Sequence, residues 1–498
     1  MRCPTDPARL KNVHITAKLN KKSTTSGYDA MLISSIFTPQ KGQPLGRFGQ
    51  LALVGTLSLV PLTSSAGEPQ GFMEEASLQT TLFYIYRDRD RRQGGMGPAG
   101  EGRPGAYASN LQHSTANLAV DFSSGYAGGV VGLDLAAFAA YDFQNRHQGT
   151  EFNFRPASTL WEERWDGKET NGASLYRAAL KLKFGDMWGR LGYLQPQGTS
   201  VIAPNWSFLP GTYRGGELGA RIGDLSLSYF HADRYKAPWY QSFYEFRQAD
   251  GETIDYLHSL GARYEVTDDL VVEAAFGQAQ GYMDQGFGKV SYATQLNDSP
   301  LRLSYQAYAA RDRHDDGSAN DVYDGTAWQQ VLTAHYGQGA FDWRLEFSWV
   351  HAPGAQGYFL PRMTTPYASS NGRMDVWWDA RSDWNHDGEK SLYAGVTYDL
   401  EGWRLPGWSL GVAHAYGWDA RPYSGFEDPG RRFSESAWNF DVHYKVQNGW
   451  AEGTRFQLHY TRYDNRTDYA SWGDGGFKNA FQDEHDIKFT VVAPFSIL

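Results

Sequence analysis

Apolar and polar residues alternate one by one along most of the chain beyond residue 66. In the segment AWNFDVHYKV, residues 437–446, every second side chain from Trp438 onward is apolar, and polar residues such as Asp441 lie between them. Residues 341–350 follow the same pattern. A period of two is typical of β-strands with one apolar and one polar face. No convincing amphipathic helix interrupts the series, so the pattern predicts an all-β protein.

About 18 such segments follow one another, near residues 77, 115, 131, 174, 188, 216, 225, 256, 269, 287, 301, 326, 341, 391, 408, 437, 454 and 485. Many are about 9 to 11 residues long, which is enough to cross a bilayer at a tilt. Short connections such as 185–187 and 223–224 alternate with long ones such as 196–215 and 352–390. Short turns at one end and long loops at the other are typical of outer-membrane β-barrels.

The chain ends in another alternating segment, residues 487–498, which can pair with the first, residues 77–86. Such pairing closes the sheet and leaves no edge exposed to lipid. The sequence therefore predicts an 18-stranded antiparallel transmembrane β-barrel with short periplasmic turns and long extracellular loops. Because this strand number is even, both ends of the barrel are expected on the periplasmic side.

The N-terminal part of the chain has the features of a signal peptide. An apolar stretch at residues 51–62 follows Lys41 and Arg47 and precedes the small residues 64–66, which is the order that export signals require. A buried core helix is the alternative. We expect residues 1–66 to be an extension and signal peptide that is cleaved, and residues 67–498 to form a single barrel domain. Export with a barrel fold predicts the bacterial outer membrane.

Composition agrees with a barrel whose lumen is polar. The 498 residues have a mean hydropathy of −0.55, and beyond residue 66 no apolar run reaches the roughly 18 residues of a membrane helix. Aromatic residues make up 15% of the chain. The net charge of −10 argues against non-specific nucleic-acid binding, and a single cysteine excludes a disulfide scaffold.

Charged residues on the polar faces of the strands are candidates to line the pore. Any solvated lumen accepts charges, which is the simpler alternative, but a basic row on the segments near 174 and 188 faces acidic residues elsewhere. Opposed charges across a narrow pore would orient polar solutes. The candidate pore-lining residues are Arg177, Lys181, Lys183, Arg190, Arg263, Arg302, Arg344 and Glu346.

The long loops are rich in aromatic residues. Aromatics at strand ends fit the interfacial girdle of a barrel, whereas those in the middle of loops are too far from strand ends for that role. An indole or phenol ring can stack on the C–H face of a sugar, while Arg and Asp pair with its hydroxyl groups. The candidate substrate-binding residues are Trp206, Phe208, Tyr213, Arg214, Trp239, Tyr358, Trp377, Trp378, Arg381 and Asp383.

We expect no metal, no cofactor and no catalysis. The run 383–388 begins like a calcium loop, but its twelfth position is Ala394 instead of the chelating glutamate, so a plain turn is the preferred interpretation. No nucleophile motif such as G-x-S-x-G occurs. An outer-membrane hydrolase assembled from distant loops and a structural barrel with a plugged lumen stay open as alternatives.

Several segments resemble the OprD-type substrate-specific porins of Gram-negative bacteria: APFSIL at 493–498, GFMEEASL at 71–78 and WSFLPGTYRG at 206–215. This resemblance implies a monomeric 18-stranded barrel in outer-membrane lipid and lipopolysaccharide, with the loop 196–215 folded into the lumen as a constriction. Ser207 stands where many members have arginine, which weakens any inference of selectivity for carboxylates or basic amino acids.

Longer segments, including EAAFGQAQGYMDQ at 273–285 and YASSNGRMDVWWDARSDW at 367–384, are similar to the chitooligosaccharide channels of that family. That similarity implies passive diffusion of N-acetylglucosamine oligomers. A porin for small carboxylates or basic amino acids is the alternative, which the basic row favours and the loop tryptophans disfavour.

Overall fold

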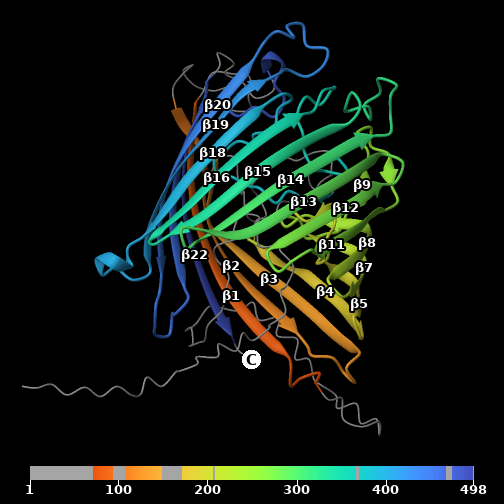
Figure 1. Ribbon diagram of the computed structural model, residues 1–498, viewed down its shortest axis with the longest axis vertical. Coiled ribbons are helices and arrows are strands. Elements are labelled where there is room, and N and C mark those ends of the chain that lie inside the picture. The colour runs from red at the N-terminus through yellow and green to blue at the C-terminus, as the bar shows by residue number, and fades with distance from the viewer. Residues whose placement is uncertain are drawn as a thin grey trace, which may run out of the picture.

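The computed structural model describes residues 71–92, 107–147, 171–205, 208–365, 370–466 and 474–496. The expected signal peptide within residues 1–66 lies outside these ranges. The described chain forms one antiparallel sheet of 18 strands that are tilted around a common axis (Figure 1). In the part of the chain that the structure describes, no helix is long and apolar enough to span a membrane.

The barrel strands have the following bounds: β1 (Ser77–Arg92), β2 (Tyr107–Ser123), β3 (Val131–His147), β4 (Gly172–Phe184), β5 (Met187–Leu194), β7 (Thr212–Ile222), β8 (Leu225–Lys236), β11 (Leu257–Glu265), β12 (Leu270–Ala279), β13 (Met283–Leu296), β14 (Ser299–Asp312), β15 (Ala327–Gln338), β16 (Phe341–His351), β18 (Lys390–Asp399), β19 (Trp408–Ala420), β20 (Phe433–Lys445), β21 (Arg455–Asn465) and β22 (Glu484–Ser496). The loops and turns contain β6 (Ile202–Ala203), β9 (Phe246–Arg247), β10 (Thr253–Ile254), β17 (Asn371–Gly372) and the short 3-10 helices η1 (Glu401–Trp403) and η2 (Asp474–Gly476).

The first and last strands close the barrel. β1 pairs with β22 in antiparallel register from Gln79 opposite Ser496 to Arg91 opposite Glu484. Each of the 18 strands therefore has a partner on both sides, and no backbone edge is left unpaired. The predicted fold class is confirmed, and every predicted segment falls on one of these strands.

Alternation along each strand separates an outer apolar face from an inner polar one. On β16, Leu345 is 51% exposed whereas its neighbour Glu346 is 2% exposed. The outward side chains on this strand include Trp343 and Trp349, in keeping with an aromatic and aliphatic surface toward lipid. The inward face carries the charges that the sequence pattern placed there.

Two long connections fold inward and meet inside the barrel. The connection between β5 and β7 contains β6, and the connection between β16 and β18 contains β17; these two strands pair, with Ala203 opposite Asn371. The backbone N–H of Val201 donates to Oγ of Ser259 on β11 at 3.0 Å, so the first loop lies against the barrel wall. The expected inward loop is confirmed, and the second inward loop adds to it.

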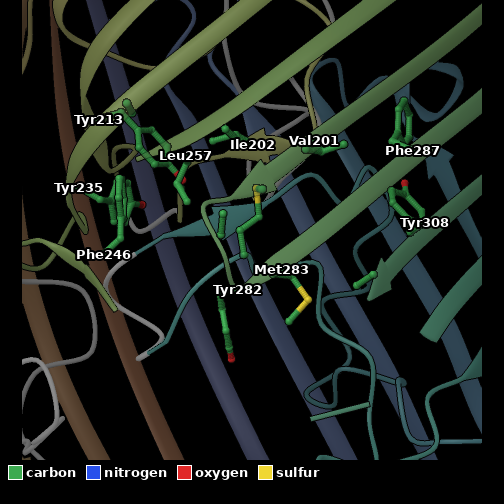
Figure 2. Close-up of a cluster of buried hydrophobic side chains, with 14 of the residues drawn as sticks. Val201, Ile202, Tyr213, Tyr235, Phe246, Leu257, Tyr282, Met283, Phe287 and Tyr308 are labelled. Carbon is green, nitrogen blue, oxygen red and sulfur yellow. The ribbon is translucent and has the colours of Figure 1, made fainter. Parts of the chain in front are cut away.

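Apolar side chains hold the two loops on the wall. The cluster in Figure 2 joins Val201 and Ile202 of the first loop to strand residues such as Tyr213, Tyr235 and Leu257, all of which are buried. Tyr213 also donates its hydroxyl hydrogen to the backbone oxygen of Ala203 at 2.7 Å. Burial of each large apolar side chain contributes about 1.5–3 kcal/mol, so this part of the interior is a packed core that narrows the pore.

Candidate pore constriction

A cavity of about 530 Å³ lies between the second inward loop and the inner barrel wall. Strands β12 to β16, β18, β20 and β21 supply its wall. The second loop supplies the facing side with Asp375, Val376, Trp377 and Asp379. The cavity extends to Asp268 and Asp269 in the short turn between β11 and β12. The cavity therefore occupies the part of the pore that is nearest the short turns.

Ion pairs fix the second loop to the barrel wall. Asp375 accepts a hydrogen bond from Lys289 at 2.7 Å and another from Arg373 at 2.7 Å. Burial alone would raise the pKa of Asp375, but the positive charges of Arg373 and Lys289 outweigh it and lower that pKa below its usual value. The carboxylate therefore stays ionised and keeps the loop attached.

Asp379 makes a second attachment of the same loop. It pairs with Lys488 on β22, and its other carboxylate oxygen lies 3.6 Å from Nε2 of His459 on β21. Burial opposes ionisation, but the charges of His459 and Lys488 prevail and lower the pKa of Asp379 to about 2. The loop is thus held from two sides of the barrel by two carboxylates, Asp375 and Asp379, whose lowered pKa values keep them ionised.

The adjacent tryptophans of this loop have different surroundings. The indole N–H of Trp378 donates to Oε2 of Glu346 at 2.6 Å, and its ring stacks on Tyr393 with 5.4 Å between ring centroids. Trp378 is buried, so it positions the loop. Trp377 is half-buried and lines the cavity, and its backbone oxygen accepts a hydrogen bond from Arg344 at 2.9 Å.

The predicted residues Arg302, Arg344 and Glu346 come together in this cavity. Arg344 donates to Glu346 at 2.6 Å and lies over the ring of Tyr393 at 4.9 Å. Arg302 lines the cavity and forms no ion pair with any residue that the structure describes. The site therefore offers one paired and one unpaired guanidinium beside an aromatic ring.

The remaining predicted basic residues lie on other parts of the barrel and have partners of their own. Arg177 pairs with Asp121 at 3.1 Å, Lys181 with Asp134 at 3.0 Å and Arg190 with Glu217 at 3.2 Å. Lys183 lies over the ring of Tyr126, and Arg263 pairs with Glu265. None of these five basic residues is among the residues that line the cavity.

Most of the predicted loop residues are engaged elsewhere. Phe208 packs on Phe83 of β1, and Tyr213 and Trp239 are buried in the loop core. Trp206 lies outside the described residues. Arg214 forms an ion pair with Asp233, and Arg381 forms one with Glu484. Asp383 accepts a hydrogen bond from Asn479 at 3.0 Å. The backbone of Tyr358 forms a β-bridge with that of His386.

Several cavity residues were not singled out as site residues. They share polar or aromatic chemistry and are Lys289, Asp375, Asp379, Tyr393, Asp441, His443 and His459. The alternating pattern could have indicated Asp441 and His443, because both lie on the polar face of the segment 437–446. No comparable signal exists for Asp375 and Asp379, because their position depends on how a long loop folds back into the barrel.

A closed barrel narrowed by its own inward loops, with a polar cavity on the short-turn side, is the architecture of a porin. The chain matches the OprD family of outer membrane porins over residues 70–477 and belongs to that family. It is therefore an outer-membrane channel for small solutes. Family membership also confirms the expectation of a channel rather than an enzyme.

Among its relatives, the chain is 48% identical over 444 residues to the Chitoporin of Escherichia coli strain K12, covering 86% of this chain and 93% of that protein. It is 24% identical over 453 residues to Porin D of Pseudomonas aeruginosa, covering 87% of this chain and 94% of that protein. Among solved structures, OccAB1 of Acinetobacter baumannii superposes with a TM-score of 0.68 at 18% identity, covering 87% of this chain and 100% of that chain.

Proposed function

We propose that this porin mediates the passive diffusion of chitooligosaccharides across the outer membrane. The observation that carries the proposal is the cavity at Trp377, where an aromatic ring lies among paired cations and carboxylates. The similarity to a protein named Chitoporin over nearly its whole length supports the same substrate class.

The arrangement suits a neutral, polar chain of sugar rings. Trp377 can stack on the C–H face of one ring, as aromatic surfaces do with amphipathic ligands. Arg302 can donate to hydroxyl and N-acetyl oxygens, and Asp441 and His443 offer further partners across the cavity. A sugar that moves along the pore exchanges one set of hydrogen bonds for the next.

Charge pairing at the constriction favours a neutral solute. Lys289 is paired with Asp375, and Arg344 with Glu346, so most of the positive charge is already compensated. Each contact with the sugar must also be weak, because a channel conducts only if its solute can leave.

A porin for small carboxylates is the second candidate. The unpaired guanidinium of Arg302 favours it, because a fixed cation in a pore attracts anions. Selectivity for basic amino acids, the other form of this alternative, would depend on the carboxylates of Asp375, Asp379 and Asp441 in the same cavity.

Liposome swelling separates these candidates. Proteoliposomes that contain the purified porin are placed in equal osmolar concentrations of chitohexaose, glutamate or arginine. The proposal predicts the largest porin-dependent swelling rate in the sugar relative to empty liposomes. Faster swelling in glutamate or arginine than in chitohexaose would show that the porin prefers that charged solute and would contradict the proposal.

We also propose that the porin works as a monomer surrounded by outer-membrane lipid and lipopolysaccharide. The outward face carries exposed aliphatic and aromatic side chains on strands around the barrel, among them Leu191, Leu260 and Leu345. Light scattering of the detergent-solubilised protein should give the mass of one chain plus detergent, and a trimer mass would contradict the proposal.

A further inference from the structure

Three ionisable side chains meet at the end of the second inward loop, outside the cavity. His386 and Glu389 lie between β17 and β18, and Glu435 lies near the start of β20. One ligand atom from each comes within 4.8 Å of the other two. All three residues are at most 1% exposed.

The cluster is short of positive charge. In the described parts of the chain, neither Glu389 nor Glu435 forms an ion pair with lysine or arginine. Oε2 of Glu389 accepts a hydrogen bond from the backbone N–H of His386 at 2.9 Å and lies 3.2 Å from Nδ1 of the same residue. Glu435 accepts hydrogen bonds from the hydroxyl groups of Ser382 and Tyr463. Two buried carboxylates at this separation require a proton or a cation between them, because isolated buried charges are strongly destabilising.

Unsatisfied atoms lie at the same place. Oε1 of Glu389 and Nε2 of His386 are buried, and no residue that the structure describes offers either atom a hydrogen bond of good geometry. Buried polar atoms in native proteins nearly always have a partner. Their lack of one, next to a second carboxylate, points to a ligand that the three side chains share.

We propose that His386, Glu389 and Glu435 bind a divalent transition-metal ion, and that Zn²⁺ suits the site best. Imidazole nitrogen and carboxylate oxygen are both ligands of Zn²⁺ in proteins, and three protein ligands are enough to hold the ion. The separation of 3.2 Å between Nδ1 of His386 and Oε2 of Glu389 is close to the spacing of two ligands on one small ion, which bind at about 2.0–2.2 Å each.

Calcium does not fit this site. It takes six or more oxygen ligands, whereas this cluster supplies an imidazole. The nearby residues that look like a calcium loop are already engaged in the fold: Asp387 accepts a hydrogen bond from the backbone N–H of Ala352 at 2.8 Å, and Asn385 donates to the backbone oxygen of Phe359 at 2.6 Å.

The ion would connect a loop to the barrel wall. His386 and Glu389 follow the loop segment that carries Trp377 and Asp379, and Glu435 belongs to a membrane strand. Binding would therefore fasten the end of the loop that forms one side of the cavity. This inference does not depend on which solute the porin carries.

The test uses the full protein in detergent, stripped with EDTA and then titrated with Zn²⁺ in a calorimeter, with elemental analysis of the zinc retained after gel filtration. We expect about one zinc per chain and a higher thermal unfolding temperature. E389Q and E435Q should each weaken zinc binding by more than about 100-fold, since loss of a supporting group alone costs up to that much. E452Q is the matched control, because Glu452 lies in the short turn between β20 and β21, at the opposite end of β20 from Glu435. This variant should bind zinc like the wild type.

Two results would overturn the proposal. If zinc neither binds nor stabilises the wild type, while its unfolding temperature changes with pH near neutrality, the two carboxylates share a proton instead. If calcium stabilises the protein as strongly as zinc, the ion binds elsewhere. Both measurements are made on the wild-type protein, so they test the proposal even if a variant fails to fold.

Discussion

Two adjacent tryptophans show how differently neighbouring side chains serve this pore. Trp378 is buried and donates a hydrogen bond to Glu346, whereas Trp377 lines the cavity. The sequence marked both as candidates for binding but could not distinguish them, because the difference depends on the path of the loop. Arg344 and Glu346 were predictable, since strand periodicity alone decides which side chains face inward.

Replacement of Trp377 by alanine should weaken sugar binding in the pore. Aromatic contacts of this type contribute about 0.5–1.5 kcal/mol, so the concentration of chitohexaose that half-blocks the current should rise several-fold. The unfolding temperature should change little, because Trp377 is only half-buried. W403A, which alters an exposed tryptophan in a short turn, serves as the control. An unchanged half-blocking concentration in W377A would exclude stacking at this residue.

The low pKa of Asp379 predicts a specific dependence of the protein's stability on pH. Its pKa in the folded protein, about 2, is lower than the value of about 3.9 in an unfolded chain. Its ionised form therefore stabilises the fold fully above pH 4, and this contribution disappears as the pH falls toward 2. D379N should be less stable than the wild type by about 1 kcal/mol at pH 7, a modest amount because the carboxylate is partly exposed.

The difference in unfolding temperature between D379N and the wild type should be present at pH 5 and should vanish toward pH 2. Thermal unfolding followed by intrinsic fluorescence at several pH values measures it. A difference that already disappears at pH 5 would mean that Asp379 has an ordinary pKa and does not hold the loop by charge.

At the level of elements, the inward loops are what turn a wide barrel into a selective pore. All 18 strands could be predicted, because each contains an alternation of apolar and polar residues, although it is weak in some of them. The pairing of β6 with β17 could not, because it joins two short loop segments 168 residues apart at Ala203 and Asn371. Such contacts have no local pattern and follow from tertiary packing.

Gly261 of β11 permits the close approach of the first loop. A Cβ atom at this position would lie 1.8 Å from the backbone oxygen of Thr199. G261A should therefore displace this loop from the wall, lower stability by about 1–3 kcal/mol through overpacking and raise the single-channel conductance. G286A is the matched control, because no atom lies within 4 Å of a Cβ built there. Equal conductance in both variants would show that the loop does not limit the pore.

At the scale of the whole molecule, the closed sheet places an apolar surface toward lipid and leaves a polar interior that the loops divide. The low mean hydropathy of the chain follows directly, because every second strand residue faces the lumen. Aromatic residues serve both sides: Trp343 and Trp349 lie on the outer surface, and Trp377 lines the cavity. Composition alone could not show which aromatic residues face lipid and which face the pore, because that depends on the orientation of each strand and on the path of the loops.

The most direct test of this account is a planar-bilayer recording of single channels titrated with N-acetylglucosamine oligomers. We expect chitohexaose to interrupt the ion current in a concentration-dependent manner, with brief blocks that show weak binding, and glutamate and arginine at equal concentrations to have little effect. Channels that conduct but are blocked by glutamate or arginine and unaffected by chitohexaose would contradict the proposed function.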